Sequence, residues 1–247
     1  MRNKLFSLPL FLVLAGGVCW AGEPPTVDVQ TAANIDARLQ HSNVIKHGDV
    51  QVTYANGVAT LTGTVDNLGS KLDAEKAARK VHGVTQVVDN IQVVAKGVGD
   101  PQIIKQARHE ILTYYAYTIF DNVNLQVENG NVIVSGQVTL PFKKGDIGNT
   151  LARVKGVATL VNKLEVLPTS MFDDRLRWQL ARAIYGDPFF VHYRVQPNPP
   201  IHIIVKNGNV TLEGVVATTL DRTKADMAAR GTGLSFSVVD NLRVVNG

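Results

Sequence analysis

Histidine is the residue type most able to do chemistry near neutral pH, because its ordinary pKa lies close to that range. None of the six histidines of this chain falls in an HExxH motif or an HxH pair, and no acidic cluster has the spacing of a calcium loop. We therefore expect no metal site and no cofactor. The six are His41, His47, His82, His109, His192 and His202.

Nucleophile and phosphate-binding motifs are also missing. No serine stands in a GxSxG motif, and Ser135 falls in the middle of a predicted strand, where a nucleophile elbow would not be. The GDIG stretch at 145–148 has the form of a KH loop, but it carries an acid where phosphate would approach. Gly231 and Gly233 precede a predicted strand instead of opening a helix. These patterns predict no catalytic residues, no enzyme and no nucleic-acid partner.

The predicted helix 172–185 carries the strongest candidate for a binding residue, Trp178. At about 100° per residue, Trp178 and Tyr185 project about 20° apart and lie opposite the apolar residues, with Arg175 and Arg182 beside them. A helix that is buried on one face gives no internal reason for a tryptophan on the other face. The face that we expect in the core is formed by Phe172, Leu176, Leu180, Ala183 and Ile184.

Two interpretations of these aromatic side chains stay open. In the first, Trp178 and Tyr185 pack against a neighbouring unit of the protein. In the second, they contact an anionic phospholipid surface, since aromatic rings settle at the headgroup level and arginines meet anionic lipid. The stretch at 111–120, ILTYYAYTIF, is a secondary candidate surface, because at least one of its tyrosines must leave any single buried face. These tyrosines are Tyr114, Tyr115 and Tyr117.

The candidate residues belong to a chain in which two phrases occur three times. NGVATLTGTV at 56–65 returns as NGNVIVSGQV at 129–138 and as NGNVTLEGVV at 207–216. A second phrase follows each copy, as VVDNIQVV, LVNKLEVL or VVDNLRVV, with its central Asp or Asn 32 residues beyond the glycine of the Asn-Gly pair. Two phrases that recur at one internal spacing indicate tandem duplication. The glycines are Gly57, Gly130 and Gly208, and the later residues are Asp89, Asn162 and Asp240.

Each copy shows the signals of helix, strand, strand, helix and strand. Asn-Gly between two β-type runs favours a two-residue hairpin turn whose central residues both take positive φ. The glycine in the middle of each second strand predicts a bulge or a helix that crosses close over the backbone. The clearest second helix is 70–81, with one buried apolar stripe, and first helices are expected at 31–39, 101–115 and 172–185.

This order predicts an α+β fold with three tandem α-β-β-α-β units. Each unit would be a three-stranded mixed sheet with two helices on one face, because that arrangement buries every apolar stripe. Turn-rich joints separate the units, which we expect at residues 26–96, 100–168 and 170–246.

The element order, the phrase NGxVxLxGxV and the terminal phrase VxxVxNxLxV resemble the BON domain, found in bacterial envelope and osmotic-stress proteins. The resemblance covers nearly the whole chain after its first residues, as three copies. It implies binding and not catalysis. Members are typically exported, some associate with phospholipid membranes, and others act as stress-linked or small-ion-binding modules. The domain brings no catalytic residues.

The first 21 residues are typical of a secretory signal peptide. Arg2 and Lys4 precede an apolar run at 5–14, which is far shorter than the about 20 residues of a membrane-spanning helix. We expect cleavage after Ala21, with lipid attachment at Cys19 as the alternative. The mature chain would be periplasmic, without cysteine and without a transmembrane span. Its net charge would fall from +4 to +2, which is too small to indicate a polyanionic partner.

Two functions from different classes therefore fit the sequence. The first is an envelope module that binds an anionic phospholipid surface or another envelope component, in envelope maintenance or stress. The second is a periplasmic scaffold whose three units bind a partner protein, with exposed aromatic residues as the centre of the contact.

Overall fold

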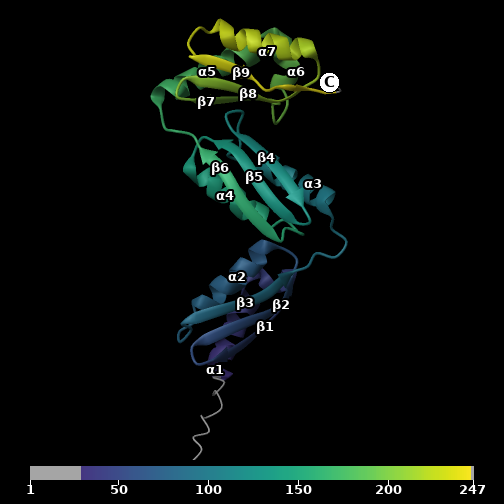
Figure 1. Ribbon diagram of the computed structural model, residues 1–247, viewed down its shortest axis with the longest axis vertical. Coiled ribbons are helices and arrows are strands. Elements are labelled where there is room, and N and C mark those ends of the chain that lie inside the picture. Colours follow the sequence, from purple (N-terminus) through teal and green to yellow (C-terminus); the bar gives the residue numbers. More distant parts are fainter. Residues whose placement is uncertain (1–28, 246–247) are drawn as a thin grey trace, which may run out of the picture.

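The computed structural model describes residues 29–245, in which three units follow one another along the long axis of the molecule (Figure 1). The predicted signal peptide, with its alternative at Cys19, lies outside the described residues. Unit one consists of α1 (Val29–His41), the 3-10 helix η1 (Asn43–His47), β1 (Gly48–Ala55), β2 (Val58–Val65), α2 (Leu68–Arg79) and β3 (Gln86–Val93).

Units two and three repeat the order helix, strand, strand, helix, strand without η1, and unit three adds two short helical turns before its first strand. Unit two consists of α3 (Asp100–Thr113), β4 (Asn122–Glu128), β5 (Asn131–Val138), α4 (Pro141–Ala152) and β6 (Thr159–Val166). Unit three consists of α5 (Met171–Tyr185), η2 (Pro188–Phe190), α6 (Val191–Arg194), β7 (Ile201–Lys206), β8 (Asn209–Val216), α7 (Thr219–Gly231), β9 (Ser237–Asp240) and β10 (Arg243–Val244).

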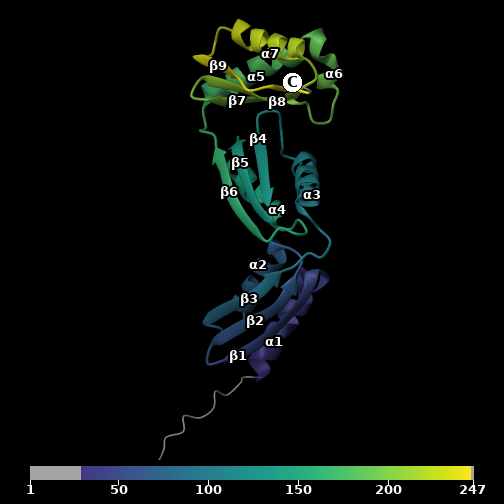
Figure 2. The same ribbon diagram turned by 45° about the vertical axis from the view of Figure 1, so that its right-hand side comes forward.

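Every unit is a small mixed sheet. The first two strands pair antiparallel, and the last strand returns parallel to the second one, so the second strand is central. In unit three the last strand is split into β9 and β10, which both pair with β8. Each unit has its own apolar core, and in unit three α5 and α7 lie on the side of the sheet away from unit two (Figures 1 and 2). The predicted α+β fold with three tandem units is confirmed.

The Asn-Gly pairs form the hairpin turns that the sequence predicts. Asn56, Asn129 and Asn207 have φ angles of 49°, 51° and 50°, and the glycines that follow have φ angles of 83°, 76° and 76°. Asparagine tolerates this left-handed region better than other residues that carry a side chain, and glycine adopts it freely. The turn residues therefore set where each hairpin reverses.

The recurring mid-strand glycine has a different cause from the one expected. Gly63, Gly136 and Gly214 have φ angles of 123°, 120° and 126°, yet the strand register runs through them without an extra residue. A Cβ atom at these positions would lie 1.9–2.1 Å from the carbonyl oxygen of a residue in the first strand or, at Gly214, directly before it. The prediction of a bulge or a crossing helix is therefore wrong, and close approach of the neighbouring strand requires glycine.

A carboxylate at the start of the first helix holds the hairpin in units two and three. Asp173 accepts hydrogen bonds from the backbone N–H groups of Asn207 and Gly208, both at 2.8 Å. Asp100 does the same with Asn129 and Gly130, at 2.8 and 3.0 Å. These acids also lie in the first turn of a helix, where negative charge is favoured by the helix dipole. They join helix and hairpin, which lie far apart in the sequence.

The Asp or Asn of the second phrase is also structural. In each unit its side-chain oxygen accepts a hydrogen bond from the backbone N–H two residues later, at 2.9–3.1 Å. The same side chain reaches the second helix of its unit, so it ties the last strand to that helix. The contacts join Asp89 to Lys71, Asn162 to the carbonyl of Lys144, and Asp240 to Arg222.

Direct contacts connect neighbouring units. Between units one and two, the N–H of Leu68 donates to the carbonyl of Val157 at 2.9 Å, and Arg153 forms an ion pair with Asp73 at 2.6 Å. Between units two and three, the N–H of Ile203 donates to the carbonyl of Ile119 at 2.7 Å. The segment around Ile119 thus covers the outer edge of β7, and its side chain packs against the core of unit three.

Candidate binding surface

The helix α5 carries the candidate binding residues and has a well-formed start. The side chain of Ser170 accepts a hydrogen bond from the N–H of Asp173 at 3.2 Å, which is the usual capping arrangement. The buried side of the helix contains Leu176, Leu180 and Ile184. Phe172, which the sequence placed in this core, is instead 47% exposed.

Trp178 lies outside the core of its own unit, as predicted. Its side chain is 67% exposed, and its ring contacts Phe120 of unit two edge-on, with 5.2 Å between ring centroids. The contact with unit two therefore covers only part of the indole. Most of the ring remains available to a lipid or a protein.

Arg175 and Arg182 are exposed on the same helix as Trp178, three residues before it and four residues after it. This spacing places both on the face of the helix that Trp178 occupies. Neither guanidinium group has an ion pair or a hydrogen bond within residues 29–245. Both are thus free to meet an anionic group.

Tyr185 does not belong to this surface, so its prediction as a neighbour of Trp178 is wrong. It is 7% exposed, its hydroxyl donates to the carbonyl of Ile201 at 2.6 Å and accepts from the N–H of the same residue at 2.9 Å. Burial raises the pKa of this tyrosine. Tyr185 is buried because the chain that runs through η2 and α6 to β7 closes over the last turn of α5.

The three tyrosines of unit two do not form one surface. Tyr115 is 85% exposed, which confirms that at least one of them leaves the buried face. Tyr114 packs against the core of unit two and donates to the carboxylate of Asp146 at 2.7 Å. Tyr117 also packs there and lies 5.5 Å from the ring of His202 in unit three. Only Tyr115 remains a candidate for an external partner.

A hollow of about 300 Å³ lies beside Trp178, at the junction of units two and three. Leu140, which is 45% exposed, and Phe120 line it from unit two. Its wall also contains Lys143 and Arg177, which are only 3% and 4% exposed. Charged side chains on predicted helices are expected in solvent, so no sequence signal could have located these two.

Both buried cations have partners, which explains how they can be buried. Lys143 contacts the fully buried carboxylate of Asp121 at 2.7 Å. Arg177 pairs with Asp174 and donates to the carbonyl of Val205 at 2.7 Å. They therefore stabilise the walls, and the free charges of this surface are those of Arg175 and Arg182.

Within residues 29–245, His47 is the histidine that contacts a carboxylate, because its Nδ1 lies 3.0 Å from Oδ1 of Asp66. Neither His192 nor His202 is hydrogen-bonded to a carboxylate or a hydroxyl there. Over the same residues, no group of three or more His, Cys, Asp or Glu side chains could hold a metal ion. None of the described helices is long and apolar enough to cross a membrane.

Comparison with protein-family models shows three matches to the BON domain, at residues 27–95, 100–168 and 190–246. The chain belongs to the BON-domain family. Its three tandem BON units are the three units of the fold. The third match begins after α5, so Trp178 and its arginines lie outside the part of unit three that the BON model covers.

Two solved structures of CdsD, a structural protein of the type III secretion system of Chlamydia trachomatis, are similar to this BON protein over most of their length. One has 16% sequence identity and a TM-score of 0.26, with 86% of this chain and 91% of that chain covered. The other, the C-terminal domain, has 15% identity and a TM-score of 0.26, with 89% and 98% covered. No curated protein matches the chain.

Proposed function

We propose that this BON protein is a non-enzymatic, periplasmic binding protein of the bacterial cell envelope that associates with phospholipid membranes. Its family supports an envelope role, because BON domains occur in envelope-associated proteins. The observation that carries the proposal is the exposed indole of Trp178, which stands between two unpaired guanidinium groups on α5.

The chemistry of this surface favours an anionic lipid headgroup. An indole has a flat apolar body and one N–H donor, which suits the boundary between headgroups and acyl chains. Arg175 and Arg182 add attraction to negative lipid, worth about 1 kcal/mol for each charge near the surface. Leu140, across the hollow, would add apolar contact from unit two.

A binding function without catalysis is consistent with the repeated motifs. The Asn-Gly pairs form turns, the strand glycines allow close strand pairing, and the Asp or Asn of the second phrase ties a strand to a helix. The repeated residues thus serve the fold, which supports a binding function. A role in envelope maintenance or stress is part of the same proposal.

Co-sedimentation with vesicles tests the membrane association. We expect the protein to bind vesicles of phosphatidylcholine with phosphatidylglycerol more strongly than vesicles of phosphatidylcholine alone. Arg182→Gln should weaken binding to the anionic vesicles about fivefold, and added salt should mimic this change by screening. Arg38→Gln is the matched control, because Arg38 is an exposed, unpaired arginine on α1 of unit one.

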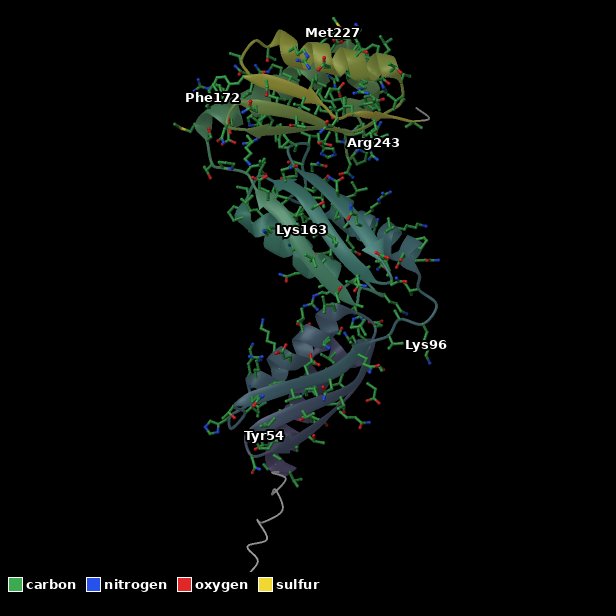
Figure 3. The ribbon with its side chains drawn as sticks, viewed as in Figure 1. Tyr54, Lys96, Lys163, Phe172, Met227 and Arg243 are labelled. Carbon is green, nitrogen blue, oxygen red and sulfur yellow. The ribbon has the colours of Figure 1, made fainter. Side chains whose placement is uncertain are left out.

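Trp178→Ala should weaken binding to both kinds of vesicle while the thermal midpoint stays nearly unchanged, because the side chain is 67% exposed. Met227→Ala is its control, since this side chain is 64% exposed on α7, at the end of unit three that faces away from unit two (Figure 3). If Trp178→Ala unfolds the protein, or if neither vesicle retains the wild type, the lipid proposal is wrong. A partner protein then becomes the occupant to seek.

A further inference from the structure

A cleft of about 570 Å³ lies between units two and three. One wall is formed by α3 and the first half of β4, and the other by the face of the β7-β8-β10 sheet that its helices leave open. The volume lies within the range of about 300–1,000 Å³ that holds small ligands. The cleft is separate from the hollow beside Trp178, because the two share no residue.

Two arginines from different units line this cleft. Arg108 comes from α3 and Arg243 from β10, on the side of unit three that faces unit two (Figure 3). Both are exposed, and neither has an ion pair or a hydrogen bond in the part of the chain that the structure describes. The acid in the lining, Glu213, accepts a hydrogen bond from the side chain of Asn241 at 2.7 Å. The cleft therefore has an excess of positive charge.

The rest of the lining combines an apolar wall with polar groups. Leu112 and Leu125 belong to the apolar part, and Leu112 is 45% exposed. Asn124 and His202 belong to the polar part, and Nδ1 of His202 is buried without a hydrogen-bond partner among the described residues. Apolar walls with a few polar groups are typical of small-ligand sites.

We propose that this cleft binds a small soluble molecule in which an oxyanion, a phosphate or a carboxylate, is attached to a short apolar group. Arg108 and Arg243 hold the oxyanion from opposite sides, since guanidinium groups bind such anions through charge-assisted hydrogen bonds. The apolar group lies against Leu112 and Leu125. Because each unit supplies one arginine, the ligand also links units two and three.

Calorimetric titration of the full chain with hexyl phosphate tests this site. Hexyl phosphate should bind, and inorganic phosphate and hexanol should each bind more weakly, because each supplies only one half of the recognition. Hexanoate serves as the carboxylate probe. Arg108→Gln and Arg243→Gln should each weaken hexyl phosphate binding about tenfold or more, as expected for the loss of a bond between charged groups.

The double variant Arg175→Gln/Arg182→Gln is the matched control, because it removes two equally unpaired arginines that lie on α5 and outside the cleft. It should keep hexyl phosphate binding and lose binding to anionic vesicles, while Arg108→Gln/Arg243→Gln should do the reverse. The two proposals can therefore fail separately. The proposal of a ligand site in the cleft is wrong if a cleft variant keeps hexyl phosphate binding. It is also wrong if a cleft variant loses only vesicle binding.

Nuclear magnetic resonance provides a second measurement that does not depend on the variants. Hexyl phosphate should shift the side-chain amide signals of Asn124 and Asn241, one on each wall of the cleft. The side-chain amide of Asn34, exposed on α1 of unit one, should not move. Shifts spread over all three units, or no shift at Asn124 and Asn241, contradict a site in this cleft.

Discussion

Replacement of Asp173 by alanine tests how unit three is held together. The carboxylate of Asp173 is fully buried and accepts hydrogen bonds from the N–H groups of Asn207 and Gly208 at 2.8 Å. A hydrogen bond to a charged group contributes about 1.5–3 kcal/mol. The bond to Gly208 is buried, whereas the bond to Asn207 is only partly buried, so its loss should cost less. We therefore expect Asp173→Ala to lower the free energy of unfolding of unit three by about 3 kcal/mol.

Urea unfolding followed by indole fluorescence measures this loss. Trp178 reports on unit three because it lies on α5, and the other tryptophan, Trp20, belongs to the predicted signal peptide, so the mature chain carries Trp178 alone. A loss of about 3 kcal/mol should also lower the thermal midpoint of a unit of this size by more than about 10 °C.

Two variants provide the controls for Asp173→Ala. Asp173→Asn keeps a carbonyl oxygen as an acceptor and should cost less. Asp100→Ala removes the equivalent carboxylate of unit two, so it should leave the fluorescence transition of unit three in place and reduce hydrogen-exchange protection at Gly130. A loss below about 1 kcal/mol for Asp173→Ala would refute the reasoning, because water would then replace the carboxylate at little cost.

Two further predictions concern stability. Gly214→Ala should destabilise the protein by more than about 2 kcal/mol in urea unfolding, because its φ is 126° and a Cβ would lie 1.9 Å from the carbonyl oxygen of Pro200. Gly145→Ala, in α4 with no atom within 4 Å of the new Cβ, should instead stabilise by about 0.5–1 kcal/mol, and equal effects would contradict the steric argument. Burial lowers the pKa of His202 from its ordinary value, and the negative charges of Asp121 and Glu213 oppose this shift only in part. Folding therefore favours the neutral imidazole of His202. The free energy of unfolding is highest above about pH 6.5, where the imidazole is neutral in both states, and it decreases as the pH falls from there through the lowered pKa of the folded state. The urea midpoint should fall between about pH 7 and pH 5, and His202→Gln should reduce that fall; an equal fall in both proteins would contradict it.

The repeated elements of the fold could be predicted because their signals are local. An Asn-Gly pair forms a hairpin through the φ angles of two residues, and a strand alternates its faces every two residues. These rules apply equally to all three copies, and the structure shows hairpins at all three Asn-Gly pairs. The glycines of the second strands were located correctly, but their cause was missed, because it is a backbone carbonyl oxygen of the chain segment that runs beside them.

The candidate surface could be predicted only in part. Trp178 and Tyr185 project about 20° apart on an ideal helix, yet one is 67% exposed and the other 7%. The buried side of α5 is also wider than its apolar residues indicate, because it includes the paired Arg177. The cleft that contains Arg108 and Arg243 had no sequence signal, since these residues lie in different units and meet only when the units pack.

The sequence by itself determined the number of units, their hairpins, the order of helices and strands along each unit, and the membership of the BON family. Turn preferences and apolar periods act over a few residues, so they can be recognised in the amino-acid sequence alone. The tertiary structure alone decided which side chains of α5 are exposed, which acids hold the hairpins, and what lies between the units. Those outcomes depend on contacts between residues far apart in the chain, such as the segment after α5 that covers Tyr185 and the loop of unit two that lies against β7.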